Sequence, residues 1–175
     1  MKDNGAEMIV DGVKVQIVSL DTHDDYTPPR LQEVLEQVHA ACADDSEVES
    51  FALSVFRRRG FLGLGTSITE LELSKSPGPR RRILNVFLGG GQDGTAVLEC
   101  IRQHHQVKLI RERHLEWGWL GYELQGESCQ FALLIETILH EGLGVRDRER
   151  IGATFYLRDG RVVSLGLHDD RQPID

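Results

Sequence analysis

Apolar residues recur at intervals of three and four in three parts of the chain, which is the spacing of an amphipathic helix. These runs extend over 31–42, 97–101 and 131–139. Thr27 is the expected N-cap of the first helix, with Pro28 as its first residue. The polar residues expected to begin the second and third helices are Thr95 and Ser128. The pattern therefore predicts three helices, each with one face to bury.

Runs rich in β-branched and aromatic residues predict strands between these helices. The expected strands are 48–57, 66–74, 82–88, 107–115 and 117–124. Two further pairs of strand-like runs are each separated by an Asp-Gly dipeptide, Asp11-Gly12 near the N-terminus and Asp159-Gly160 near the C-terminus. Asp-Gly between such runs is typical of a tight hairpin, so we expect one hairpin near each end of the chain.

The predicted order is two strands, helix, three strands, helix, two strands, helix, two strands. So many consecutive strands do not suit a doubly wound sheet. They favour an α+β fold with a mostly antiparallel sheet and about three helices packed on one face. We expect a single domain over 1–175, with an N-terminal hairpin (1–20), a core of helices and strands (28–144) and a C-terminal hairpin (151–168).

The composition predicts a folded protein with a core of ordinary size. Of the 175 residues, 40% are hydrophobic and 27% are charged, which is a globular balance. No stretch approaches the roughly 18 apolar residues of a membrane helix, and no signal-peptide core follows Met1, so we expect a cytoplasmic protein without a membrane partner. Cys42, Cys100 and Cys129 are odd in number and widely separated, which predicts core residues instead of a disulfide framework or a zinc site.

The formal net charge of −8 bears on the class of partner. An acidic chain repels a polyanion, so we expect no nucleic-acid partner and favour a basic protein partner. The basic runs Arg57-Arg58-Arg59 and Arg80-Arg81-Arg82 do not change this expectation. In an up-down-up meander they fall at opposite ends of the strands and form no common patch.

A glycine-rich segment follows one predicted strand and precedes a predicted helix. Gly89, Gly91 and Gly94 satisfy the pattern G-x-G-x-x-G, and Glu112 lies about 20 residues further on. The segment 83–112 thus resembles the first strand-helix-strand unit of the Rossmann nucleotide-binding family. The resemblance implies that the glycines cradle a pyrophosphate and that Glu112 binds a ribose hydroxyl. A plain structural loop is the other interpretation of the same glycines.

Three aromatic residues lie close together before the third helix. Trp117 and Trp119 are two residues apart, so on a strand they point to the same face, and Tyr122 follows closely. Such residues are either core or, on an open face, anchors for a partner, because tryptophan and tyrosine dominate binding hot spots. Trp117, Trp119 and Tyr122 are therefore the candidate partner-binding residues.

Other chemically capable residues give no assembled site. The triplets His23-Asp24-Asp25 and His168-Asp169-Asp170 hold ligands that a divalent cation accepts, and each is equally an ordinary loop sequence. Glu136 and His140 are one helical turn apart and fit a general base with its orienting partner, or a solvated helix face. Because no nucleophile motif accompanies them, we expect no catalytic residue, no metal and no cofactor.

Three hypotheses follow from these patterns. The first is a non-enzymatic module that masks or escorts a protein partner, as inhibitor, immunity or secretion-chaperone proteins do. The predicted order of elements over 28–144 is similar to that of type III secretion chaperones, which implies a binding role. The second is a nucleotide-binding enzyme or sensor of NAD type that uses the loop 89–94. The third is a subunit that assembles with further copies of itself.

Overall fold

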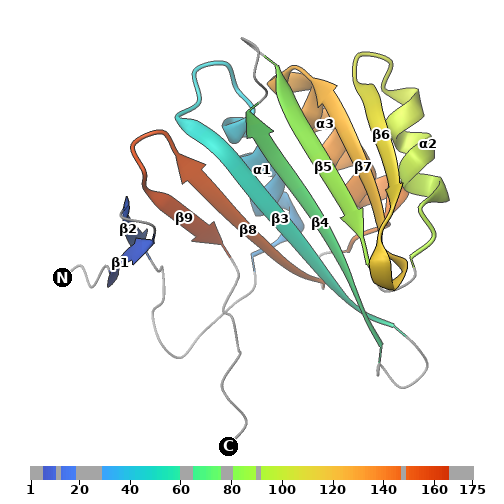
Figure 1. Cartoon of the computed structure of the whole chain (residues 1–175), viewed down its shortest axis with the longest axis horizontal. Coiled ribbons are helices and arrows are strands. Elements are labelled where there is room, and N and C mark those ends of the chain that lie inside the picture. Colours follow the sequence, from blue (N-terminus) through green and yellow to red (C-terminus); the bar gives the residue numbers. More distant parts are fainter. Residues whose placement is uncertain are drawn as a thin grey trace, which may run out of the picture.

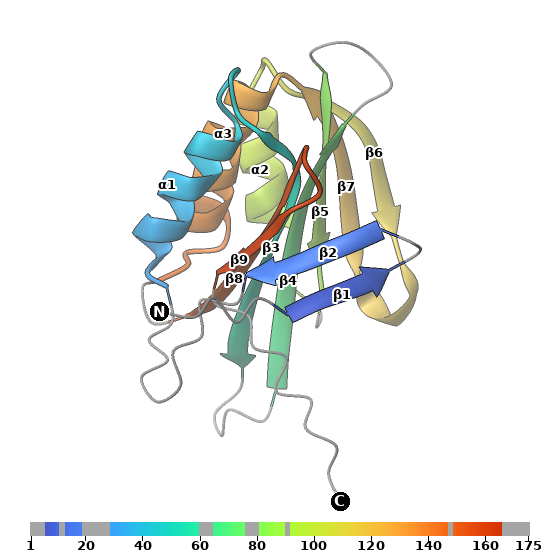
Figure 2. The same ribbon diagram turned by 90° about the vertical axis from the view of Figure 1, so that its left-hand side faces the viewer.

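The computed structural model describes residues 6–10, 13–18, 29–59, 65–75, 81–89, 92–146 and 149–165. Over these residues the chain forms one nine-stranded sheet with three α-helices on a single side (Figure 1). Turning the molecule by 90° shows the helices together on one side of the sheet (Figure 2). The predicted α+β class with a mostly antiparallel sheet is confirmed.

The strands follow the predicted order along the chain. They are β1 (Ala6–Val10), β2 (Val13–Val18), β3 (Val48–Arg59), β4 (Gly65–Lys75), β5 (Arg82–Leu88), β6 (Lys108–His114), β7 (Leu120–Gly126), β8 (Arg150–Leu157) and β9 (Val162–Leu165). In the sheet they lie in the order β1-β2-β9-β8-β3-β4-β5-β7-β6. The two hairpins and the meander of β3, β4 and β5 are antiparallel, whereas β2 and β9 pair in parallel.

The helices cover the middle of the sheet. They are α1 (Leu31–Ala41), α2 (Thr95–Gln103) and α3 (Ser128–Thr137), and a π-helical turn η2 (Ile138–Gly142) extends α3. α2 and α3 begin at Thr95 and Ser128, as the sequence predicts, whereas the start of α1 and the N-cap of α3 differ from the prediction. Pro28 lies outside the described residues and α1 begins at Leu31, after Arg30 as N-cap, while Gly94 and Glu127 are the N-caps of α2 and α3. η2 ends at Gly142 with Leu143 as its C-cap, and Gly144 follows with a φ of 58°, which favours glycine.

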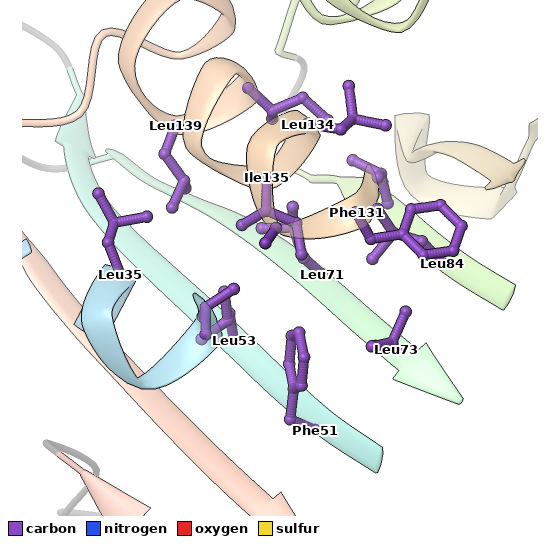
Figure 3. Close-up of a cluster of buried hydrophobic side chains, with 14 of the residues drawn as sticks. Leu35, Phe51, Leu53, Leu71, Leu73, Leu84, Phe131, Leu134, Ile135 and Leu139 are labelled. Atoms are coloured by element: carbon purple, nitrogen blue, oxygen red, sulfur yellow. The ribbon is translucent and has the colours of Figure 1, made fainter. Parts of the chain in front are cut away.

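The core lies between the helices and the helix-facing side of the sheet. Period-2 alternation puts Phe51, Leu53 and Val55 of β3 on this side, and all three are buried. Leu71 and Leu73 of β4 continue the layer. Figure 3 shows Phe51, Leu53, Leu71 and Leu73 together with Leu35 of α1, Phe131, Leu134 and Ile135 of α3, and Leu139 of η2.

The two arginine runs lie at different ends of the strands, as the meander predicts. The Arg57 guanidinium pairs with Glu149 at 3.0 Å, near the end of β3. The Arg82 guanidinium, at the start of β5, donates instead to the carbonyls of Val48 and Glu49, where β3 begins. No common basic patch forms from the described arginines of these runs.

Candidate functional site

The three predicted aromatic anchors have three different environments. The hypothesis placed Trp117 and Trp119 on one strand face, but residues 116–118 form a 3₁₀ turn, η1 (Glu116–Gly118), and β7 begins only at Leu120. Tyr122 is 3% exposed and belongs to the core, so it cannot contact a partner. Trp119 is half-buried, and the side chain of Trp117 lies outside the described residues.

The glycines of the loop make room for these aromatic side chains. A Cβ added to Gly89 would lie 2.5 Å from the Trp119 ring, and one added to Gly94 would overlap the Tyr122 hydroxyl. The Tyr122 hydroxyl is 3.5 Å from the Gly94 carbonyl, to which it donates. Ring atoms therefore fill the space that the nucleotide hypothesis assigned to phosphate at Gly89 and Gly94. Gly91 lies outside the described residues.

A buried glutamine holds the same loop against the sheet. The Gln92 side chain is 5% exposed, and its amide nitrogen lies 3.0 Å from three acceptors: the Thr69 hydroxyl and the carbonyls of Ile68 and Gly89. At the start of α2, the Asp93 carboxylate accepts hydrogen bonds from the Thr95 N–H and hydroxyl, which lowers the pKa of Asp93. The helix N-terminus that would attract a phosphate already has a carboxylate as its acceptor.

The strand order also differs from that of a nucleotide-binding unit. β5 and β6 each pair antiparallel with β7, so they run in the same direction but are separated by one strand. The Rossmann unit needs its two parallel strands as neighbours. Glu112 is exposed on β6 and lies opposite Tyr122. The resemblance of 83–112 to that family is therefore not a structural one.

The other candidate groups do not assemble into a catalytic or metal site. Glu136 pairs with His39 of α1 at 2.9 Å, and not with His140 as the general-base interpretation requires. The two His-Asp-Asp triplets lie outside the described residues, and within those residues no cluster of histidine, cysteine and carboxylate side chains could hold a metal ion.

The three cysteines differ in their exposure. Cys42 and Cys100 are buried core residues, as predicted, and burial raises the pKa of the Cys42 thiol to about 12, so it stays protonated. Cys129 is exposed, so the prediction of a third core cysteine is wrong.

The sheet face opposite the helices is the remaining candidate for a functional surface. We call it the open face; its residues alternate with the core residues along each strand. The strand register aligns them in two rows across the sheet, Thr154-Ala52-Glu72-Asn85-Glu123 and Gly152-Ser54-Glu70-Phe87-Gly121. None of the described helices covers this face (Figure 2).

The open face has a side with small residues and a side with charged ones. Over β3 and β8 it carries the small residues Ala52, Ser54, Gly152 and Thr154, of which Gly152 is buried and the other three are half-buried. Over β4, β5 and β7 it carries carboxylates and an aromatic ring. Tyr156 of β8, which is 45% exposed, stands beyond the small residues.

Two of the carboxylates have no cationic partner within the described part of the chain. Glu123 pairs with Arg113 of β6 at 2.7 Å, whereas no described cation pairs with Glu70 or Glu72. Glu70 is half-buried, and burial, followed by repulsion from the Glu72 carboxylate, raises the pKa of Glu70. These glutamates were not among the candidate residues predicted from the sequence, although the alternation Glu70-Leu71-Glu72-Leu73 is the signal of a strand with one polar face.

Comparison with protein families, with curated proteins and with solved structures finds no match to this chain. The described residues include no helix long and apolar enough to cross a membrane. The fold and the open face therefore define the molecule as a single α+β domain with helices on one face of its sheet.

Proposed function

We propose that this protein is a non-enzymatic binding module that masks or escorts a protein partner, as an inhibitor, an immunity protein or a secretion chaperone does. The open face is its docking surface. The observation that carries this proposal is the open face itself: the described helices cover one side of the sheet, and the other presents Glu70 and Glu72 without a described cationic partner.

The order of elements supports a role in binding. From α1 to η2 the chain runs helix, three strands, helix, two strands, helix, which is the order that is similar to type III secretion chaperones. A likeness in the order of elements does not by itself decide function, and the open face supplies the further support. The described titratable groups also favour binding over catalysis, because Glu136 is engaged by His39 and the Cys42 thiol stays protonated.

The charge of the chain indicates what kind of partner fits. A net charge of −8 attracts a basic protein from a distance and speeds their encounter. On the open face, negative charge is concentrated at Glu70 and Glu72, next to the small side chains of Ala52 and Ser54. A partner with basic and apolar side chains would therefore fit both parts of this face.

A bulky substitution in the middle of the open face tests the proposal. In Ser54→Trp the indole would cover Gly152 and lie beside Glu70, which are the neighbours of Ser54 on β8 and β4. Gln37→Trp, at an exposed position on α1, adds the same side chain to the helix layer and is the control. Each variant is used as a tagged full chain to capture proteins from the native cell, with circular dichroism as the check of folding.

The two variants give opposite expectations. We expect a stoichiometric protein partner to be retained by the wild type and by Gln37→Trp and lost by folded Ser54→Trp. Equal capture by both variants would remove the open face as the docking surface.

A further inference from the structure

Glu70 lies in the middle of the open face between a small residue and an aromatic one. Ser54 of β3 is its neighbour on one side and Phe87 of β5 on the other, and the three strands lie side by side (Figure 1). Glu72 follows two residues later on the same face. The Phe87 ring lies over Gly121 of the next strand, about 3.4 Å from where a Cβ would be. Two carboxylates of β4 thus lie on one side of a half-buried aromatic ring.

The described arginines of β6 are too distant to neutralise this pair. Arg111 and Arg113 belong to β6, which is separated from β4 by β5 and β7. Three strand spacings put their backbone about 14 Å from that of Glu70. Arg113 is already engaged by Glu123. Among the described side chains, no cation therefore pairs with Glu70 or Glu72, and a partner can supply one.

The occupant of this surface follows from its charge. A second copy of the chain, docked through the same face, would bring Glu70 and Glu72 toward identical carboxylates, which repel. The chain's own last ten residues, 166–175, contain three aspartates and one arginine, so their net charge has the wrong sign. A basic segment of another protein has complementary charge.

We infer that the open face binds an arginine side chain of the protein partner, with Glu70 and Glu72 accepting from the guanidinium and Phe87 stacking against it. This inference rests on the proposed function, because it names the group of the partner that the docking surface recognises. Arginine suits the surface better than lysine. Its planar guanidinium donates two parallel hydrogen bonds to a carboxylate and stacks on an aromatic face, which an ammonium group does not. An arriving cation would also stabilise the charged form of Glu70, whose pKa burial raises.

An NMR titration of the full chain with a small probe tests this inference directly. The probes are N-acetyl-arginine amide, its uncharged counterpart N-acetyl-citrulline amide, and N-acetyl-lysine amide. We expect the arginine probe to shift the backbone amide resonances of Ser54, Glu70 and Phe87, the lysine probe to shift them less, and the citrulline probe to leave them unchanged.

Three variants assign the effect to particular side chains. Glu70→Gln should weaken binding of the arginine probe about five-fold, the effect of one partly exposed charge pair. Glu36→Gln removes the same charge from an exposed position on α1 and should leave binding unchanged. Phe87→Leu keeps an apolar side chain without the ring and should remove the preference for arginine over lysine.

The outcomes separate this inference from the proposed function. Shifts spread evenly over the acidic surface, or an unchanged titration in Glu70→Gln, would overturn the arginine site. If Ser54→Trp nevertheless loses the partner, the open face remains the docking surface and only the arginine site is wrong. If the arginine shifts are found but Ser54→Trp still captures the partner, the arginine site exists and the proposed function of the face is wrong.

Discussion

Ionised Glu70 destabilises the folded state, and a binding role explains why the residue is present. Its pKa is raised, so the folded protein binds this proton more tightly than the unfolded chain does. Below the ordinary pKa of a glutamate both states are protonated and the cost is absent. As the pH rises through the folded-state pKa, ionisation of the half-buried carboxylate lowers the free energy of unfolding. Functional sites often retain such a cost because function needs the group.

Glu70→Gln is therefore expected to stabilise the protein at neutral pH. Since the side chain is only half-buried, we expect a rise in Tm of about 1–2 °C at about pH 7.5, and a smaller difference at about pH 4. Thermal melts of wild type and variant at both pH values measure this. Glu36→Gln changes the net charge equally and should show no such pH-dependent gain. A lower Tm for Glu70→Gln at neutral pH would mean that the carboxylate is favourably paired.

Gln92 is expected to act as a structural clamp on the loop between β5 and α2. Gln92→Leu leaves the buried Thr69 hydroxyl and the Gly89 carbonyl without their donor, so the free energy of unfolding should fall by about 2–3 kcal/mol. Chemical denaturation measures the loss. Gln37→Leu, at an exposed position on α1, should change it by less than about 0.5 kcal/mol. Equal stability of the two variants would contradict the clamp.

The role of single residues was the least predictable part of the sequence. The pattern Gly89, Gly91, Gly94 is satisfied equally by a phosphate cradle and by glycines that make room for rings, and only the positions of Trp119 and Tyr122 distinguish the two. Tyr122 was predicted as an anchor because the alternation of residues shows only that the strand has two faces. It does not show which face the helices cover.

At the scale of elements, the sequence predicted the helices and hairpins that depend on residues close together in the chain. The apolar stripes located α1, α2 and α3, the two Asp-Gly dipeptides located the hairpins, and β5 was predicted at its observed bounds. The start of β7 was wrong, because Gly118 takes a φ of 72° and residues 116–118 turn instead of extending. The split of β5 and β6 by β7 could not be predicted, because it depends on pairing between distant segments.

Two neighbouring residues of α3 provide a matched test of how this helix packs. Leu134 is fully buried, whereas Leu133 is 57% exposed. Leu134→Ala should lower the free energy of unfolding by about 2–5 kcal/mol, because it leaves a cavity in the core. Leu133→Ala should lower it by about 0.5 kcal/mol or less. Urea denaturation compares the two, and a larger loss for Leu133→Ala would contradict the orientation of α3.

At the scale of the whole molecule, the two sides of the sheet have different roles. The side that faces α1, α2 and α3 holds the core and supplies the stability of the fold. The open face contributes little to that core, so its side chains are free to meet a partner. Over β3 and β8 this face has small side chains, and over β4 the carboxylates give it negative charge.

The affinity of the captured partner for open-face variants tests the central claim most directly. Calorimetry would compare wild type, Ser54→Trp and Gln37→Trp at low and at high salt. The proposal predicts that Ser54→Trp loses at least about ten-fold in affinity, that Gln37→Trp matches the wild type, and that salt weakens binding to the wild type. Undiminished affinity of folded Ser54→Trp, or a loss of affinity in Gln37→Trp alone, would place the docking surface on the helix side and contradict the account.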